Sequence, residues 1–267
     1  MKYGNFEVQY RKNLQDIYIP CTLPSNLECL SCLKEKKDSC TLLVRDKYKN
    51  QKYILKIAKN SRALALKREN CLLRELRKKG IRAFPSPQCL VEEGDSTYFL
   101  REFIEGETLI SIVKRRGCMP ERVLVRTALS LCRVLEILQA QNPCIIHRDI
   151  KPENIIYTKD RSFVLIDFET ARKYSPGKSH DTMVMGSRLT AAPEQYGFSQ
   201  TDCRTDIYGL GMTFLFLACG SYERSELKNS GISKPLRRII GKAVAFEPGK
   251  RYRNARRLRQ DLEKLRR

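Results

Sequence analysis

The feature that most constrains the fold is a short polar stretch held between two pairs of isoleucines. Residues 145–156 read I-I-H-R-D-I-K-P-E-N-I-I. The charged and hydrogen-bonding side chains here are costly to bury, because an unpaired charge loses its hydration inside a protein. The flanking isoleucines, by contrast, are expected to be buried. The pattern therefore predicts a polar loop that is anchored at both ends in an apolar core.

A second acidic residue follows at a spacing that returns it to this loop. Eighteen residues after Asp149 the chain reads V-L-I-D-F-E, which places Asp167 behind a short apolar run. The segment 155–166 is long enough for one small hairpin, so Asp167 is expected to lie near Asp149 and Asn154. Two carboxylates and an amide suit a hard cation with oxygen ligands, above all magnesium bound to phosphate groups.

The order of the predicted elements indicates an α+β architecture. Length and a hydrophobic content of 42% suffice for one large domain or for two lobes. Strand-like runs come first, at 27–33, 40–46, 52–57, 88–93 and 97–103. Helical patterns follow the third of them at 63–80 and dominate later, as at 121–141 and 210–220, apart from short apolar pieces around 155–168. The sequence predicts a small β-rich N-lobe at 27–104 after an N-terminal extension at 1–26, and a helical C-lobe at 105–267.

A lysine and a glutamate in the first half form a candidate ion pair. Lys56 is expected to end a strand, and Glu69 lies on the helix predicted at 63–80. If both are buried, the pair can hold an ammonium group against phosphate oxygens.

The chain is strongly basic, with 51 Lys and Arg against 30 Asp and Glu and a net charge of +21. Such a surface attracts polyanions in general. The densest patch, 251–267, carries Leu258, Leu262 and Leu265 at helical spacing, which predicts a terminal amphipathic helix packed on a core. No nucleic-acid motif accompanies the charge, so nucleic acid is not the expected partner.

Cysteines and hydropathy indicate a cytoplasmic protein. The 11 cysteines are odd in number and scattered, and only Cys29 and Cys32 form a C-x-x-C pair, so reduced thiols are expected rather than a disulfide framework or a metal site. No apolar run reaches the length that a membrane span needs, and residues 1–10 lack the apolar core of a signal peptide.

Four motifs in order resemble one family. H-R-D-I-K-P-E-N (147–154) matches the catalytic loop of eukaryotic-like (Hanks-type) serine/threonine protein kinases at every signature position. A-A-P-E-Q (191–195) is similar to the bacterial form of the motif that closes the activation segment. D-I-Y-G-L-G (206–211) resembles the helix that follows, and Arg251 matches the arginine that pairs with Glu194. The resemblance covers residues 27–265 and implies a two-lobed kinase fold.

The resemblance implies a role for each matching residue in the loop. Asp149 would accept the proton of a substrate hydroxyl or orient that hydroxyl, and Lys151 would neutralise charge on the transferring phosphoryl group. Asn154 and Asp167 would hold Mg²⁺. His147 is expected to pack as a structural residue rather than to act as a base.

For the nucleotide, the resemblance implies that Lys56, oriented by Glu69, contacts the α- and β-phosphates of ATP. Residues 102–104 would form the adenine hinge through backbone groups. Further nucleotide-contacting positions are implied at Ile54, Glu102, Ile104 and Ile156. Ile54 stands where alanine is usual, which should narrow the adenine pocket.

Regulatory roles are implied within the activation segment, 167–194. Ser187 matches a position that contacts the catalytic acid in serine/threonine kinases. The segment 175–187 is polar and contains proline and glycine, which predicts a surface loop. A phosphate on Thr182 would pair with cations such as Arg148 and raise activity. In the alternative, Arg148 makes only structural hydrogen bonds and the loop needs no modification.

The sequence departs from the family at several positions. The stretch aligned with the glycine-rich phosphate loop, 33–44, has no glycine, and its lysines are either phosphate contacts or solvated turn residues. Glu169 replaces the glycine that usually follows Asp167-Phe168, and Arg101 occupies the gatekeeper position. Two functions therefore stay open: a serine/threonine protein kinase using ATP and Mg²⁺ on protein substrates, or a pseudokinase that acts as a nucleotide-binding or scaffolding module. A small-molecule phosphotransferase fits the motif at 191–195 less well.

Overall fold

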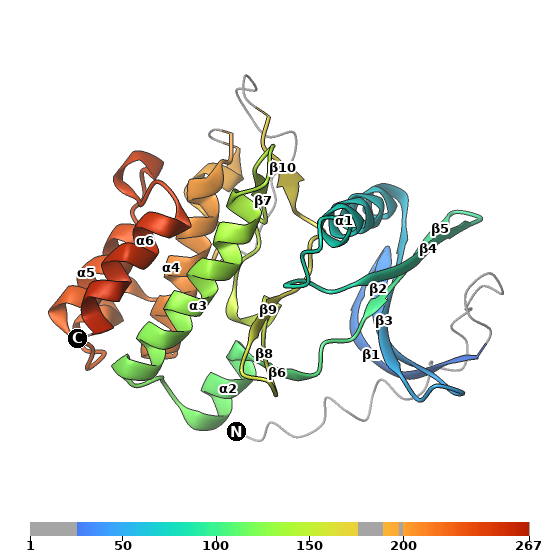
Figure 1. Ribbon diagram of the computed structural model, residues 1–267, viewed down its shortest axis with the longest axis horizontal. Coiled ribbons are helices and arrows are strands. Elements are labelled where there is room, and N and C mark those ends of the chain that lie inside the picture. Colours follow the sequence, from blue (N-terminus) through green and yellow to red (C-terminus); the bar gives the residue numbers. More distant parts are fainter. Residues whose placement is uncertain (1–25, 176–188, 198–199, 267) are drawn as a thin grey trace. The chain divides into compact units, whose positions relative to one another are not determined.

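The structure is a computed structural model that describes residues 26–175, 189–197 and 200–266. The chain divides into two compact units, Met1–Ile104 and Glu105–Arg267, which are described separately (Figure 1). The first unit is built on a sheet and the second mainly on helices, so the fold is α+β as the order of the patterns predicts. No helix within the described ranges is long and apolar enough to cross a membrane.

The first unit contains a five-stranded antiparallel sheet and one helix. Its elements are β1 (Leu27–Lys36), β2 (Ser39–Asp46), β3 (Lys52–Lys59), α1 (Asn60–Lys78), β4 (Pro87–Glu93) and β5 (Ser96–Glu102). The strand order is β1-β2-β3-β5-β4. Alternation of side chains along the strands gives the sheet two apolar faces. One face carries a cluster that includes Leu42, Val44 and Leu55, all without exposed surface.

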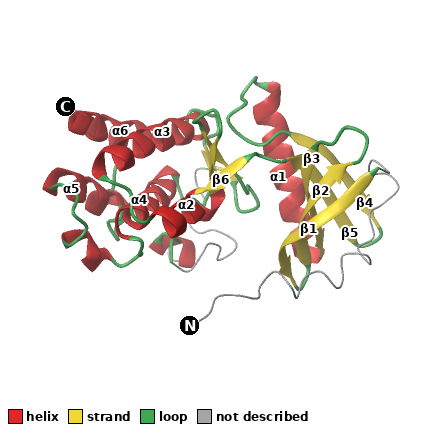
Figure 2. Cartoon of the chain, turned by 90° about the horizontal axis from the view of Figure 1, so that it is seen from below, coloured by secondary structure: helices red, strands yellow, loops and turns green. Residues whose placement is uncertain are grey.

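Helix α1 packs against β3, β4 and β5, and Figure 2 shows it lying across the sheet. The helical spacing of Leu66, Leu73 and Leu76 places these side chains on the buried face, each about 2% exposed. Glu69 lies on the same buried face, and its side chain has no exposed surface.

The second unit is built around the apolar helix α4. Its helices are α2 (Leu109–Arg116), α3 (Glu121–Gln139), α4 (Cys203–Cys219), α5 (Lys234–Ala243) and α6 (Ala255–Glu263). Helix α4 is buried on all sides and packs against α3 and α5, while α6 packs against α3 (Figure 1). A helix that is apolar all round is stable only in such a core position.

Short strands and 3-10 helices complete the second unit. The strands are β6 (Gly106–Thr108), β7 (Ile145–Ile146), β8 (Ile155–Thr158), β9 (Phe163–Leu165) and β10 (Arg172–Lys173), paired as β6-β8-β9 and β7-β10. The 3-10 helices are Pro152–Asn154, Pro193–Tyr196, Arg224–Lys228, Pro248–Lys250 and Lys264–Arg266. The hairpin predicted over 155–166 is present as β8 and β9.

Two sequence predictions need correction. Lys56 does not end its strand, because β3 continues to Lys59 and Lys56 pairs with Thr41 and Phe99 in mid-strand. The C-terminal helix is shorter than the basic stretch 251–267. It begins only after Asn254, whose side chain accepts a hydrogen bond from the backbone of Arg257 and so caps the first turn.

Candidate active site

Three of the four isoleucines that flank the polar loop are buried as the sequence predicts, and Ile156 is half-buried. β7 precedes it and β8 follows it, and Ile145, Ile146 and Ile155 are each 2% exposed or less. The first turn of α4 holds the backbone of the loop. The carboxylate of Asp206 accepts hydrogen bonds from the backbone N–H groups of His147 and Arg148, both at 2.8 Å. The pKa of Asp206 is raised to about 7 because burial outweighs the hydrogen bonds from His147 and Arg148, which act to lower it.

Sequence reasoning missed this role of Asp206. The available signal was an acidic residue in the first turn of an otherwise apolar helix, because a buried carboxylate must find donors. A second close contact comes from the same helix. A Cβ at Gly209 would lie 2.9 Å from the carbonyl oxygen of Ile150, so only glycine lets α4 approach the loop this closely.

Arg148 has a strained backbone that surrounding contacts maintain. Its φ is +66°, a region that residues with a side chain rarely adopt. The guanidinium Nε donates to the carbonyl of Thr170 at 2.7 Å, and the side chain of Gln195 donates to the carbonyl of Arg148 at 2.8 Å. Strain held by surrounding contacts is common where a chain presents functional groups.

Asp149 is the centre of a compact polar group. One oxygen of its carboxylate, Oδ2, accepts from Lys151 Nζ at 2.7 Å and from Asn154 Nδ2 at 2.9 Å. The same amide nitrogen also reaches the backbone carbonyl of Asp149 at 2.9 Å. The side chains of Lys151 and Asp149 keep 16% and 12% of their surface exposed. The acid is thus positioned by two neighbours and is still reachable by a substrate.

Asn154 and Asp167 present oxygen atoms in the same part of the second unit. The backbone N–H of Ile166 donates to the carbonyl of Asn154 at 2.9 Å, which brings the two chain segments together. Because the Asn154 amide nitrogen faces Asp149, its oxygen is left as an acceptor. Asp167 is held at φ +68° beside the fully buried Phe168. An amide oxygen and a carboxylate are ligands that Mg²⁺ prefers, so these residues fit that ion.

His147 packs as a structural residue. Its ring has no exposed surface and meets Phe168 edge to face, with the ring centroids 4.7 Å apart. Burial lowers the pKa of His147 to about 4, so the ring is neutral near pH 7. Its Nδ1 accepts weakly from the backbone N–H of Asp149 at 3.4 Å. A neutral, enclosed imidazole serves packing better than proton transfer.

The motif that closes the activation segment is pinned by a buried ion pair. The guanidinium of Arg251 contacts Glu194 through Nη1 at 2.7 Å and Nη2 at 2.9 Å, which confirms the pairing expected from the sequence. Thr205 Oγ1 adds a hydrogen bond to Glu194 at 2.8 Å. A bidentate pair of this kind fixes both position and orientation.

In the first unit, Lys56 and Glu69 form the ion pair that the sequence suggests. Lys56 Nζ lies 2.7 Å from Glu69 Oε2, and their side chains are 4% and 0% exposed. The other residues that are expected to contact nucleotide are divided between the two units. Ile54 is buried on β3, Glu102 ends β5, Ile104 is the last residue of the first unit, and Ile156 lies on β8 in the second. Their contacts with nucleotide stay predictions.

Two departures from the family are visible in the first unit. Arg101 is only 4% exposed, and its Nη1 donates to the carbonyl of Glu102 at 3.1 Å. Its Nε has no hydrogen-bond partner within the described part of the chain. The glycine-free stretch forms the β1–β2 hairpin, where Lys34, Lys36 and Lys37 are exposed. Their exposure fits both a role in contacting phosphate and a role as solvated turn residues.

The predicted regulatory residues divide between described and undescribed parts of the chain. Arg148 is described and buried, at 8% exposure. Thr182 and Ser187 lie outside the described residues, so their roles stay predictions.

Comparisons with known proteins agree with this geometry. Residues 37–265 match the family model described as protein kinase domain. A probable serine/threonine-protein kinase of Clostridium perfringens is 31% identical over 65% of this chain and 28% of its own length. Serine/threonine-protein kinase PknB of Mycobacterium leprae is 28% identical over 63% of the chain and 30% of its length. Serine/threonine-protein kinase PknA of Nostoc sp. is 30% identical over 67% of this chain and 35% of its own length. The chain thus matches about a third of the length of these relatives.

Proposed function

The chain belongs to the protein kinase family, and we propose that it transfers the γ-phosphate of ATP to serine and threonine hydroxyls of proteins. One observation supports this most directly: the carboxylate of Asp149 is held by Lys151 at 2.7 Å and by Asn154 at 2.9 Å. The three relatives, all named as serine/threonine-protein kinases, support the same choice of substrate hydroxyl.

In the proposed reaction, the substrate hydroxyl oxygen bonds to the γ-phosphorus of ATP as the bond to the β-phosphate oxygen breaks, and ADP leaves. Asp149 accepts the hydroxyl proton or orients that hydroxyl. Lys151 neutralises charge that develops on the phosphoryl oxygens. Mg²⁺ would be held by Asn154 and Asp167 and supplies charge neutralisation on the phosphates when bound.

The nucleotide contacts form part of the same proposal. Lys56, oriented by Glu69, contacts the α- and β-phosphates, and the backbone at 102–104 contacts the adenine, with Ile54 and Ile156 as apolar neighbours. The buried Lys56–Glu69 pair supports this, because burial of two charges has little value for packing alone.

Regulation by phosphorylation at Thr182 is also proposed, with Arg148 as one of its cationic partners and Ser187 as a contact of the catalytic acid. A cytoplasmic location is proposed as well. It is supported by the described cysteines, which are all free thiols, because a reducing compartment keeps thiols in that form.

The proposed function is tested by incubating the protein with Mg-ATP and a generic protein substrate and mapping phosphorylated residues by mass spectrometry. Phosphoserine and phosphothreonine are expected, and chelation of Mg²⁺ should abolish them. A protein that binds Mg-ATP and yet forms no phosphorylated residue on itself or on the substrate would overturn the proposal in favour of a nucleotide-binding scaffold.

A further inference from the structure

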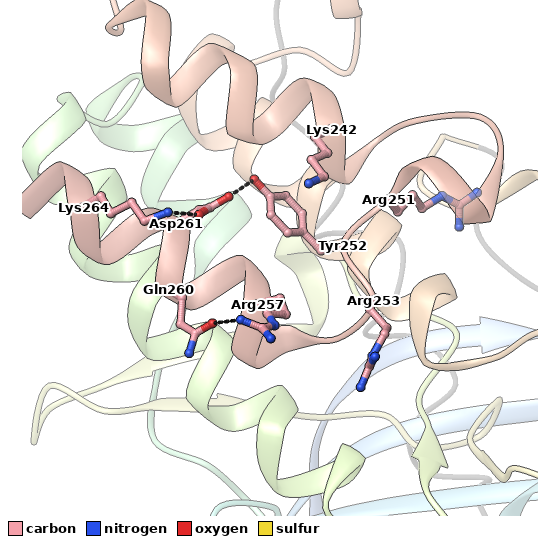
Figure 3. Close-up of a pocket in the computed structure, with 8 residues that line it drawn as sticks. All are labelled: Lys242, Arg251, Tyr252, Arg253, Arg257, Gln260, Asp261 and Lys264. Carbon is pink, nitrogen blue, oxygen red and sulfur yellow. Dashed lines mark hydrogen bonds and ion pairs between the residues drawn. The ribbon is translucent and has the colours of Figure 1, made fainter.

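A second charged site lies at the C-terminal end of the second unit, in a pocket between α5 and α6 (Figure 3). We call it the basic pocket, after the residues that define it: Lys242, Tyr252, Arg253, Arg257, Asp261 and Lys264. Its volume is about 550 Å³, within the range of ligand sites. None of its residues belongs to the loop 145–156 or to the segment 167–194, so it is separate from the candidate active site.

Some charges around the basic pocket are already neutralised. Arg251 also lines it, but its guanidinium is fully buried and paired with Glu194. Asp261 is the one carboxylate among the lining residues, and Lys264 Nζ lies 2.6 Å from it. The pairing with Lys264 lowers the pKa of Asp261, so the acid is ionised near pH 7.

Three further cations form no ion pair with a carboxylate within the described residues, although Lys242 is near enough to Asp261 to help lower the pKa of that acid. Lys242 Nζ lies 4.4 Å from the centroid of the Tyr252 ring. Arg257 Nη1 donates to Gln260 Oε1 at 3.0 Å, a neutral acceptor (Figure 3). The guanidinium of Arg253 makes no hydrogen bond or ion pair to the described part of the chain, and its side chain is exposed. The basic pocket therefore carries three positive charges that no ion pair within the described residues neutralises.

Tyr252 is an enclosed member of the basic pocket. Tyr252 is only 4% exposed, and its hydroxyl donates to Asp261 Oδ2 at 3.1 Å. This ring keeps Lys242 in place by a cation–π contact. Because the ring is enclosed, it cannot stack on a nucleobase, which binders of single-stranded nucleic acid require.

We propose that the basic pocket is a docking site for a phosphorylated serine or threonine of a protein partner. A phosphate monoester carries nearly two negative charges and strong acceptor oxygens, which match the exposed guanidiniums of Arg253 and Arg257. Guanidinium groups bind phosphate oxygens in pairs, so Arg253 and Arg257 are the expected principal contacts.

The size of the basic pocket favours a phosphorylated peptide over a free phosphate. Its volume of about 550 Å³ is larger than a phosphate ion fills, and Arg253 and Arg257 are exposed, so a phosphate carried on a peptide side chain can reach them.

The test uses the full chain without nucleotide and a short fluorescent peptide with one central phosphoserine, followed by fluorescence anisotropy. The phosphopeptide should bind, and its unphosphorylated form should bind at least about tenfold more weakly, since charge-assisted hydrogen bonds are lost. The double variant Arg253→Gln, Arg257→Gln should lose affinity by about tenfold or more.

Arg256→Gln is the matched control, because Arg256 is exposed on the same helix and does not line the basic pocket. It should leave affinity within about twofold, as expected for an exposed charge outside the contact. Inorganic phosphate used as a competitor should displace the phosphopeptide only weakly, because it makes none of the contacts of the peptide around the phosphate.

Equal binding of the two peptides, or equal affinity of the double variant and Arg256→Gln, would overturn the proposal. So would tighter binding of a single-stranded oligonucleotide that is lost in the double variant, since the site would then serve nucleic acid. The ligand is supplied ready-made, so the result does not depend on whether the chain is an active kinase.

Discussion

The two charged groups that are proposed to handle phosphate are built in different ways in the two units. Lys56 and Glu69 project from the middle of a strand and from a helix into the core, with 4% and 0% of their side chains exposed. Asp149 and Lys151 keep 12% and 16% exposed, on a loop that is held through its backbone. The first group is thus part of the core. The second lies on a loop whose backbone is held by Asp206, so the loop does not need the side chains of Asp149 and Lys151 to stay in place.

Breaking the core pair should have the largest effect on stability. Glu69→Gln removes the charged partner that lies 2.7 Å from the buried Lys56 ammonium, so the free energy of unfolding should fall by about 3 kcal/mol. Urea denaturation followed by circular dichroism measures it. The matched control is Asp149→Asn, which should cost less than about 1 kcal/mol because the loop is held by its backbone. Equal losses in the two variants would erase the contrast between the units.

A double substitution sharpens the same comparison. Lys56→Met with Glu69→Leu replaces the buried charges by apolar groups, so stability should recover to within about 1 kcal/mol of the wild type. Phosphoryl transfer should stay lost, because the ammonium is gone. Recovery of both properties would show that the pair is structural only.

A smaller effect should separate the two acids that follow the β8–β9 hairpin. Asp167→Asn should weaken Mg²⁺-dependent ATP binding by about tenfold or more, and Glu169→Gln by less than about threefold. Calorimetric titration of ATP at fixed Mg²⁺ compares them directly. The reverse ranking would mean that Glu169 is the main metal ligand and that the site differs from that of the family.

A further contrast concerns the dependence of stability on pH. Because His147 is buried and neutral, the unfolded chain takes up a proton below its ordinary pKa of about 6.5 while the folded chain does so only near pH 4. Its contribution is therefore present above pH 6.5 and is lost as pH falls towards 4, by at most about 3 kcal/mol.

His147→Phe keeps an aromatic ring against Phe168 and cannot be protonated. The difference in unfolding free energy between about pH 7.5 and about pH 5 should therefore be smaller in this variant than in the wild type. Urea denaturation of both proteins at the two pH values measures it, and other titrating groups such as Asp206 are shared by both. An unchanged difference would contradict a neutral, buried His147.

Sequence patterns predicted the sheet well because its strands are runs of apolar and β-branched residues, and burial alternates along β2. Gly94 and Asp95 lie in the turn between β4 and β5. They did not predict β7 and β10, whose two-residue ladders are too short to show a period. The second half was predicted to be mainly helical, but the position of the short helix α5 within it was not predicted. Its Lys242 enters the basic pocket, so that site could not be found from the sequence.

In the candidate active site, motif spacing predicted which residues meet but not what holds them. The contacts of Asp149 with Lys151 and Asn154 follow from one continuous motif. The support from Asp206 and the close approach at Gly209 depend on how α4 packs beneath the loop, which is a tertiary property. The left-handed backbone at Arg148 and Asp167 is likewise set by surrounding contacts and not by the residue type.

The most direct test of the central claim is the rate of phosphoryl transfer by Asp149→Asn, measured beside its affinity for Mg-ATP. Loss of the group that receives or orients the hydroxyl proton should lower the rate by about a hundredfold or more. Affinity should stay within about threefold, because the acid acts on the substrate hydroxyl and not on the nucleotide. Near-normal turnover in this variant would contradict the assignment of the loop 145–156 as the catalytic centre.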